Sequence, residues 1–262
     1  MFFANLSGGR DSTAMVIRWL ELGKPLDFIL FCDTGYEFPQ MHDYIQKLDS
    51  YLQKEFNKQI TKIDKTKEIE HWSFAYPITR GEHKGKLRGL PKMLGPSFCT
   101  RETKAKPSKE FILSQSPQKF KNNILIGYTY DEVEKGRVSN LDYGISIYPL
   151  HQWKWNEKEI DVFLKKRQLF NPLYNHFQRT GCFFCPKQSK KSLFTLWKYY
   201  PELYQIALDM EKRAKELNCI NQTFKPKSLL EYAKEFAKEF QYAKEFQTPD
   251  IALDHQNCFC GK

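Results

Sequence analysis

Apolar positions follow two different spacings along the chain, and these predict alternating strands and helices. Short apolar runs at residues 2–6 and 28–31 have the length of buried strands. Segments 157–167, 190–199 and 202–217 instead carry apolar residues at steps of three and four, as amphipathic helices do. The pattern predicts an α/β protein that ends in a helical C-terminal region.

A local repeat near the C-terminus places Tyr232, Phe236 and Phe240 at four-residue intervals. On a helix this spacing aligns the three rings along one face. Such a stripe packs against the rest of the domain or against a partner subunit, so a homodimer is one expectation.

The residues directly after the first apolar run have the composition of a phosphate-binding loop. Adjacent glycines let the backbone turn its N–H groups toward an anion, and a helix that begins near Ser12 adds the positive end of its dipole. The Gly-Lys-Ser/Thr ending of a Walker loop and the three spaced glycines of a dinucleotide-binding turn are both missing. The predicted nucleotide-binding residues are Ser7, Gly8, Gly9, Arg10, Asp11, Ser12 and Thr13. A glycine turn before a helix, without a ligand, is the alternative interpretation.

The second apolar run ends in another polar turn, which contains Asp33, Thr34 and Gly35. In open α/β sheets, ligands bind beside the C-terminal ends of the strands. The turns after the two strands therefore face one crevice, and we expect these three residues to contact the nucleotide. Asp11 and Asp33 are candidates to hold Mg²⁺ or to orient loop hydroxyls, and Asp11 can equally cap the helix that follows it.

Several motifs of the chain resemble one enzyme family. Residues 7–12 resemble the PP-loop of the adenine-nucleotide α-hydrolase-like superfamily, and residues 33–39 resemble a segment of its phosphoadenosine phosphosulfate (PAPS) reductases. Further motifs follow in the order of that family, at residues 99–107, 127–132 with Arg137, 148–150, 171–174 and 181–186. This resemblance implies a doubly wound, mostly parallel sheet with helices on both faces and a nucleotide across its switch point. We expect a nucleotide-binding domain at 1–180 and a Cys-x-x-Cys and helical segment at 181–262.

The matching motifs also bring cations to the anionic part of the nucleotide. Arginine suits bidentate contacts with oxyanions, and such contacts stabilise charge that develops on a leaving group. We therefore predict that Arg101 and Arg137 are catalytic and that Lys104 and Gly127 bind the nucleotide. Surface cations without a ligand are the alternative interpretation of the charged residues.

The chain has seven cysteines, an odd number that argues against a disulfide framework. Cys182 and Cys185 form a Cys-x-x-Cys turn, in which two thiolates can face one ion. With Cys99 and one of the tail residues Cys258 and Cys260, they make a predicted four-coordinate metal centre. Four thiolates suit zinc and a [4Fe–4S] cluster alike, and the resemblance to adenylylsulfate-reducing relatives favours the cluster. A Cys-x-x-Cys turn with nothing bound is the alternative.

The chain departs from the family at two places. Phe98 stands where the relatives with a cluster have an additional cysteine, so a fourth ligand must come from elsewhere or the site differs. Family reductases attack the sulfate sulfur with a cysteine in a Glu-Cys-Gly-Leu/Ile-His tail, whereas this chain keeps a Cys-Gly and lacks the Glu and His. We predict that Cys260 or Cys258 is the attacking nucleophile.

The net charge of +10, from 41 Lys and Arg against 31 Asp and Glu, favours an anionic partner. Residues 80–89 are the most specific candidates for contact with such a partner, because basic side chains alternate there with glycines. They predict either a mobile lid over phosphates or a solvated loop, and nucleic acid stays open as a partner. No apolar stretch approaches the ~20 residues of a membrane span, and no leader precedes the first strand. We therefore expect a cytoplasmic protein without membrane contact.

Three functions remain open on these grounds. The first is thiol-dependent reduction of an activated sulfate, PAPS or adenylylsulfate, with a thioredoxin-like dithiol as the reductant. The second is ATP-dependent sulfur transfer from a sulfur donor to a nucleic acid or a small molecule. The third is a nucleotide-binding module without chemistry.

Overall fold

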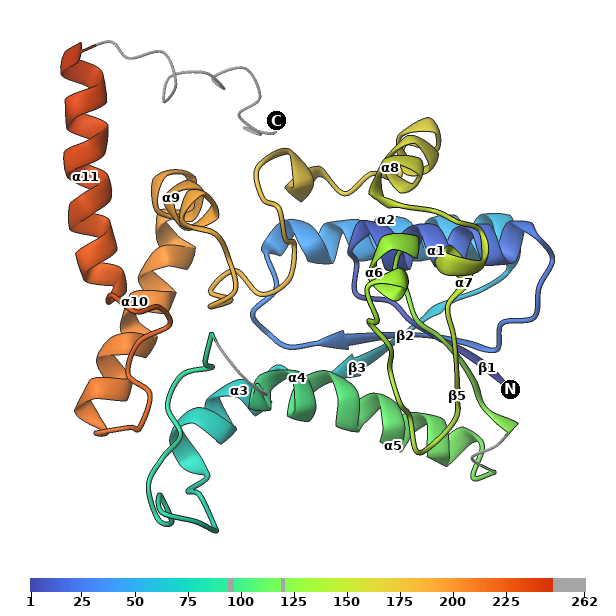
Figure 1. Ribbon diagram of the computed structural model, residues 1–262, viewed down its shortest axis with the longest axis horizontal. Helices are drawn as coiled ribbons and strands as arrows, with labels where there is room; N and C mark the ends of the chain where they lie inside the picture. The colour runs from blue at the N-terminus through green and yellow to red at the C-terminus, as the bar shows by residue number, and fades with distance from the viewer. Residues whose placement is uncertain (94–96, 119–120, 247–262) are drawn as a thin grey trace.

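A computed structural model of the 262-residue chain describes residues 1–93, 97–118 and 121–246 (Figure 1). The tail cysteines Cys258 and Cys260 lie outside the described residues. Within those residues, five strands form one sheet. The strands are β1 (Phe2–Asn5), β2 (Phe28–Asp33), β3 (Ile60–Asp64), β4 (Asn123–Leu125) and β5 (Ile145–Ile147).

The helices alternate with the strands over the first half of the chain and then follow one another. The α-helices are α1 (Arg10–Glu21), α2 (Pro39–Phe56), α3 (Glu68–Glu70), α4 (Phe98–Thr100), α5 (Lys106–Gln115), α6 (Tyr130–Glu134), α7 (Pro149–Gln152), α8 (Glu157–Lys166), α9 (Lys190–Tyr199), α10 (Pro201–Glu216) and α11 (Leu229–Phe246). Two π-helices, η1 (His71–Ala75) and η2 (Arg101–Ala105), and a 3₁₀-helix, η4 (Pro172–Asn175), complete the set. None of these helices combines the length and apolar composition that crossing a bilayer requires.

The sheet has the strand order β3-β2-β1-β4-β5, and all neighbouring strands are parallel. Ala4 of β1 pairs with Ile29 of β2 on one side and with Leu125 of β4 on the other. The chain therefore adds β2 and β3 on one side of β1 and later adds β4 and β5 on the other side. This reversal puts a topological switch point between β1 and β4, and it confirms the predicted doubly wound α/β fold.

Alternate residues of the central strands bury their side chains on opposite faces of the sheet. Phe3 and Leu30 pack with Ile112 of α5 in one hydrophobic cluster. Ala4 and Ile29 belong to the other cluster, which includes the buried faces of α1 and α2. Figure 1 shows the same two layers, with α1 and α2 over one face of the sheet and α5 over the other. This double burial explains why the strands have continuous apolar runs.

The C-terminal helices pack against one another beside the sheet domain. Phe236 of α11 is fully buried, and its ring centroid lies 5.3 Å from that of Phe194 and 5.9 Å from that of Trp197 on α9. The prediction that the aromatic stripe packs against its own domain is thus confirmed for Phe236. Phe183, Phe184 and Phe236 belong to the same buried cluster as α1, so this core continues into the C-terminal helices.

Candidate functional site

The loop between β1 and α1 is held by its own hydroxyl groups. The backbone N–H of Ser7 donates to Ser12 Oγ at 3.1 Å, and Ser12 Oγ lies 3.1 Å from the carbonyl oxygen of Gly9. Gly8 has a positive φ of 73°, which glycine adopts without strain. Gly9 occupies the N-cap position of α1, where it has no side chain to accept from the first turn. The loop is therefore ordered, with the N-terminal end of a helix behind it, as anion-binding loops are.

Two side chains from a distant segment brace this loop from outside. Asn171 is fully buried, and its Nδ2 donates to the carbonyl oxygen of Gly8 at 3.0 Å. The hydroxyl of Tyr174 accepts the backbone N–H of Arg10 at 3.1 Å. Neither residue is among the predicted nucleotide-binding residues, although both stand in the motif at 171–174. A short motif identifies such a segment, but only the fold shows that it touches the loop.

Two of the predicted loop residues point toward protein groups. Arg10 pairs with Glu157 and, at 3.3 Å, with Asp161, so its guanidinium is directed to α8. The Thr13 side chain is buried, and its hydroxyl accepts from Tyr44 at 3.4 Å. In this arrangement the backbone and the two serines, rather than these side chains, line the loop.

Asp11 is mostly buried in the first turn of α1. Burial raises the pKa of its carboxyl from 3.8 to about 6, although the charge of Arg10 works in the opposite direction. Asp11 Oδ1 is buried and accepts no hydrogen bond among the described residues. A carboxylate with an unused oxygen suits either a cation or a hydroxyl donor, so its role as a Mg²⁺ ligand stays a prediction.

Gly127 follows β4 and approaches α1 across the switch point. A Cβ at this position would lie 3.0 Å from both the Cα and the backbone nitrogen of Ser12. The glycine therefore permits the loop after β4 to close against the phosphate-binding loop. Because this contact is with protein, the role of Gly127 in nucleotide binding stays a prediction.

The turn after β2 is fixed by charge pairs. Asp33 is buried; its Oδ1 accepts the N–H of Gly35 at 2.9 Å, and its Oδ2 lies 2.7 Å from Lys62 Nζ. Gly35 has a φ of 78°, and a Cβ there would lie 2.7 Å from the carbonyl oxygen of Thr66. Both residues thus shape the turn, and their contact with a nucleotide stays a prediction.

Three segments that are far apart in sequence meet beside this turn. Thr34 Oγ1 donates to Glu37 Oε1 at 3.2 Å and lies 3.3 Å from Cys182 Sγ. Lys104 Nζ lies 3.4 Å from the same Glu37 oxygen. Glu37 is buried, and its Oε2 has no hydrogen-bond partner among the described residues. Thr34, Lys104 and Cys182 are predicted site residues, whereas the carboxylate of Glu37, which joins them, is not among the predicted residues.

The charges of this group depend on its burial. Burial raises the pKa of the Cys182 thiol, and the charge of Glu37 adds to the effect. Burial also lowers the pKa of Lys104, but the attraction of Glu37 outweighs it, so the net shift is upward. Both shifts favour the protonated forms, so at neutral pH Lys104 is an ammonium and Cys182 a thiol.

The two predicted catalytic arginines carry acidic partners in the structure. Arg101 Nε lies 2.6 Å from Oε1 of the buried Glu102. Arg137 pairs with Glu132, and its guanidinium carbon lies 4.0 Å from the ring centroid of Tyr128. Contact of either arginine with a nucleotide would require an exchange of partners and stays a prediction.

The predicted metal ligands do not form a metal centre by themselves. In residues 1–93, 97–118 and 121–246, no group of three or more His, Cys, Asp or Glu side chains has an arrangement that could hold a metal ion. Cys99 Sγ lies 2.7 Å from Ser97 Oγ, and the N–H of Cys185 donates to the carbonyl of Cys182 at 3.0 Å. The described cysteines therefore do not fit a cluster or zinc site as placed, and either centre stays a prediction.

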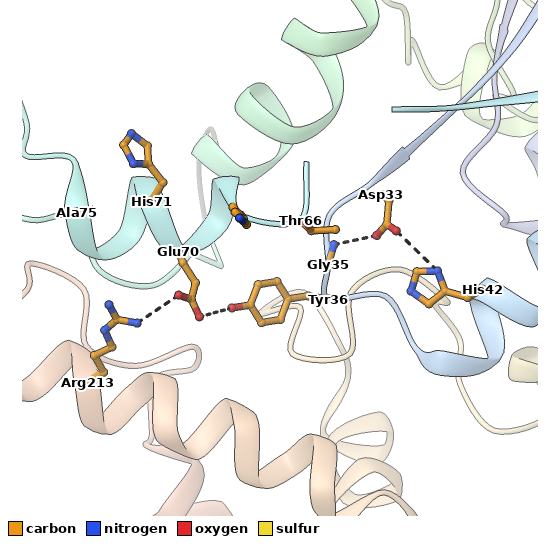
Figure 2. Close-up of a pocket in the computed structure, with 10 residues that line it drawn as sticks. Asp33, Gly35, Tyr36, His42, Thr66, Glu70, His71, Ala75 and Arg213 are labelled. Atoms are coloured by element: carbon orange, nitrogen blue, oxygen red, sulfur yellow. Dashed lines mark hydrogen bonds and ion pairs between the residues drawn. The ribbon is translucent and has the colours of Figure 1, made fainter. Parts of the chain in front are cut away.

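A pocket of about 720 Å³ opens beside the C-terminal end of β2 (Figure 2). Asp33 and Tyr36 lie on one side and His71 of η1 on the other. Tyr36 donates its hydroxyl proton to Glu70 at 3.0 Å, and Arg213 from α10 donates to the second Glu70 oxygen at 3.3 Å. The volume lies within the roughly 300–1,000 Å³ range of small-molecule sites.

Comparisons with known proteins agree with these observations. The phosphoadenosine phosphosulfate reductase domain matches residues 2–188. The uncharacterized protein MJ0973 of Methanocaldococcus jannaschii is 23% identical over 80% of this chain and 47% of its own length. The uncharacterized protein MJ0066 of the same organism is 25% identical over 76% of this chain and 39% of its own length. The chain thus spans about half or less of the length of the curated relatives it matches.

Two solved structures show weaker similarity. A PAPS reductase from Candida auris, in a phosphate complex, is 15% identical, with a TM-score of 0.46 over 69% of this chain and 80% of that chain. The U34-tRNA thiolase NcsA from Methanococcus maripaludis, with its [4Fe-4S] cluster, is 16% identical, with a TM-score of 0.40 over 100% of this chain and 76% of that chain.

Proposed function

This chain belongs to the phosphoadenosine phosphosulfate reductase domain family. We therefore propose that it is an enzyme that reduces an activated sulfate. It binds the adenine nucleotide of PAPS or adenylylsulfate at the loop of residues 7–13, and a thiol then reduces the sulfate. The loop supplies backbone N–H groups and the hydroxyls of Ser7 and Ser12 to the anion.

One observation carries this proposal: Cys182 Sγ lies 3.3 Å from Thr34 Oγ1, at the C-terminal end of the strand next to β1. The Cys-x-x-Cys turn is thereby joined to the edge of the sheet where the phosphate-binding loop lies. A nucleotide-binding loop and the Cys-x-x-Cys turn on one edge of the sheet support an enzyme that handles sulfur.

The attacking thiolate comes from the tail. Because burial raises the pKa of Cys182, that thiol ionises less readily than a free cysteine, and we assign the attack to Cys260 or Cys258 instead. The tail thiolate attacks the sulfate sulfur, an S–S bond forms, and the S–O bond to the phosphate breaks. AMP or its 3′-phosphate leaves, and the cysteine then carries the sulfonate.

A thioredoxin-like dithiol completes the cycle. One of its thiolates attacks the cysteine sulfur and releases sulfite, and its second thiolate then displaces the cysteine, so that the carrier is oxidised to a disulfide. Each turnover consumes one dithiol and returns the tail cysteine to its reduced form. No step of this sequence requires a metal centre.

A second function, ATP-dependent sulfur transfer, is favoured by one further observation. Exposed cations at residues 80–86 lie along the chain just after η1, which lines the pocket, and they suit a polyanionic acceptor. In that reaction the acceptor oxygen takes the AMP of ATP and pyrophosphate leaves. A sulfur donor then displaces the AMP.

Product analysis separates the two functions. The protein is purified without oxygen and incubated with ATP, and separately with PAPS or adenylylsulfate and reduced thioredoxin. Sulfite from the activated sulfate supports the proposal. Pyrophosphate from ATP without sulfite supports sulfur transfer instead. If neither pyrophosphate nor sulfite forms, both functions are contradicted.

A variant of the loop tests where the nucleotide binds. A Cβ at Gly9 would lie 3.1 Å from the Tyr174 hydroxyl and 3.2 Å from Ser7 Oγ, so Gly9→Val fills the loop. We expect this variant to lose nucleotide binding while Cys219→Ser, at a buried position that the site does not use, keeps it. Normal binding by Gly9→Val would place the nucleotide elsewhere.

A further inference from the structure

The segment from Pro77 to Arg88, called here the basic hairpin, is an ordered projection. Pro77 and Leu87 form an antiparallel bridge, and the N–H of Ile78 donates to the carbonyl of Lys86 at 2.9 Å. The N–H of Gly85 donates back to the carbonyl of Ile78 at 2.8 Å. These hydrogen bonds close the loop on itself, and residues 79–86 around its tip are exposed.

Three cations around the tip of the basic hairpin are exposed. Arg80, Lys84 and Lys86 are exposed, and none of them forms an ion pair with a carboxylate in the described part of the chain. This differs from other cations near the site, since Lys62 pairs with Asp33 and Lys104 with Glu37. Glu82 lies among these cations, but the three positive charges exceed its single negative charge, so the exposed loop attracts phosphates.

An aromatic surface adjoins the base of the basic hairpin. The rings of Trp72 and Tyr76 have centroids 4.5 Å apart, and the Tyr76 ring lies 5.6 Å from that of His71. Arg88 places its guanidinium carbon 5.1 Å from the Trp72 centroid and donates to the Tyr76 carbonyl at 2.8 Å. Tyr76 and His71 are exposed, so a planar group from outside can stack on them.

The aromatic surface continues into the pocket at the strand ends. His71 and Ala75 line that pocket, and the same π-helix carries Trp72. Figure 2 shows His71 and Ala75 on the helix that faces Tyr36 and Asp33 across the pocket. A bound chain can therefore keep its backbone on the basic hairpin and direct one end toward the carboxyl edge of the sheet.

We propose that the basic hairpin and the rings of His71, Trp72 and Tyr76 bind single-stranded nucleic acid. Cations that follow the phosphates, together with aromatic rings that stack on bases, are the combination with which proteins hold single strands. A single strand fits better than a duplex, because bases stacked inside a duplex do not offer their faces to these rings. This inference goes beyond the proposed function and holds whichever reaction the site performs.

Binding of labelled oligonucleotides tests the proposal. The probes are fluorescent single-stranded RNA and DNA of about 16 nucleotides, which is the largest number that one single-strand-binding domain typically covers. The hairpin variant is Arg80→Gln/Lys84→Gln/Lys86→Gln. Its control, Lys158→Gln/Lys166→Gln/Lys234→Gln, removes the same charge from exposed positions on α8 and α11. We expect the hairpin variant to bind at least about tenfold more weakly than the control, with a shallower salt dependence. Equal binding by the two variants would overturn the proposal.

A second variant distinguishes stacked bases from charge alone. Tyr76→Ala removes an exposed ring and leaves every cation in place. We expect it to weaken single-stranded binding by about fivefold or more, because each stacked base contributes measurably to affinity. Binding of heparin, a polyanion without bases, should be unchanged. If Tyr76→Ala changes neither ligand and heparin binds as tightly as RNA, the surface recognises charge only and the proposal is wrong.

Discussion

A Cβ at Gly127 would lie 3.0 Å from the Cα of Ser12, although the two residues follow different strands of the sheet. This contact closes the switch point between β1 and β4, and it depends on a missing side chain. The neighbouring atoms are backbone, which cannot rotate away as a flexible side chain can. The geometry of the phosphate-binding loop is therefore linked to the loop after β4.

Replacing Gly127 with alanine should separate the two loops. We expect Gly127→Ala to lower the free energy of unfolding by about 1–3 kcal/mol, as overpacking does, and to weaken nucleotide binding. Calorimetric titration with ATP and thermal unfolding measure the two effects. Gly181→Ala is the matched control, because nothing lies within 4 Å of a Cβ there. A Gly127→Ala protein as stable and as active in binding as Gly181→Ala would contradict the contact.

Loss of the Asn171 side chain should both destabilise the protein and weaken nucleotide binding at the loop of residues 7–13. Asn171→Ala leaves the Gly8 carbonyl without its buried donor, which costs about 1–3 kcal/mol of stability, and we expect weaker nucleotide binding. Asn156→Ala removes the N-cap of α8 at about 1 kcal/mol and leaves the loop intact. If both variants bind nucleotide equally well, Asn171 supports the fold and not the site.

The raised pKa of Asp11 predicts a pH-dependent stability. The carboxyl ionises near 3.8 in the unfolded chain and near 6 in the folded protein, so the folded state holds the extra proton between those values. Its contribution is therefore present below pH ~4 and lost as pH rises through ~6. Relative to the wild type, Asp11→Asn should gain on the order of 1–2 kcal/mol between pH 4 and 7.

Urea unfolding at several pH values, without divalent cations, measures this gain. Glu110→Gln, at an exposed position of α5, is the control and should follow the wild type throughout. A flat difference between Asp11→Asn and the wild type would show that Asp11 ionises normally in the folded protein.

Metal analysis tests the predicted centre at the Cys-x-x-Cys turn. If Cys99, Cys182 and Cys185 join a tail cysteine around a [4Fe–4S] cluster, protein purified without oxygen should contain iron and acid-labile sulfide. Cys182→Ser should lose most of both, whereas Cys219→Ser should keep them. Zinc without sulfide would favour the structural alternative, and unchanged metal content in Cys182→Ser would exclude this turn as a ligand.

Much of the fold could be predicted because it depends on local patterns. Apolar runs at 2–6 and 28–31 correspond to β1 and β2, and the expected helices at 190–199 and 202–217 correspond to α9 and α10. The glycines and polar turns after the strands marked the ligand-binding edge, since parallel strands end on one side of a sheet. The sequence by itself thus determined the fold class, the family and the position of the loop.

Contacts between distant segments could not be predicted from the sequence. Asn171 reaches Gly8, Thr34 reaches Cys182, and Arg10 turns toward α8, and no spacing along the chain encodes these meetings. Burial also changed the chemistry, because a thiol that looks reactive in a motif becomes harder to ionise once it is packed. The tertiary structure decided which charges are paired and which remain free, since pairing depends on the distance between groups in space and not along the chain.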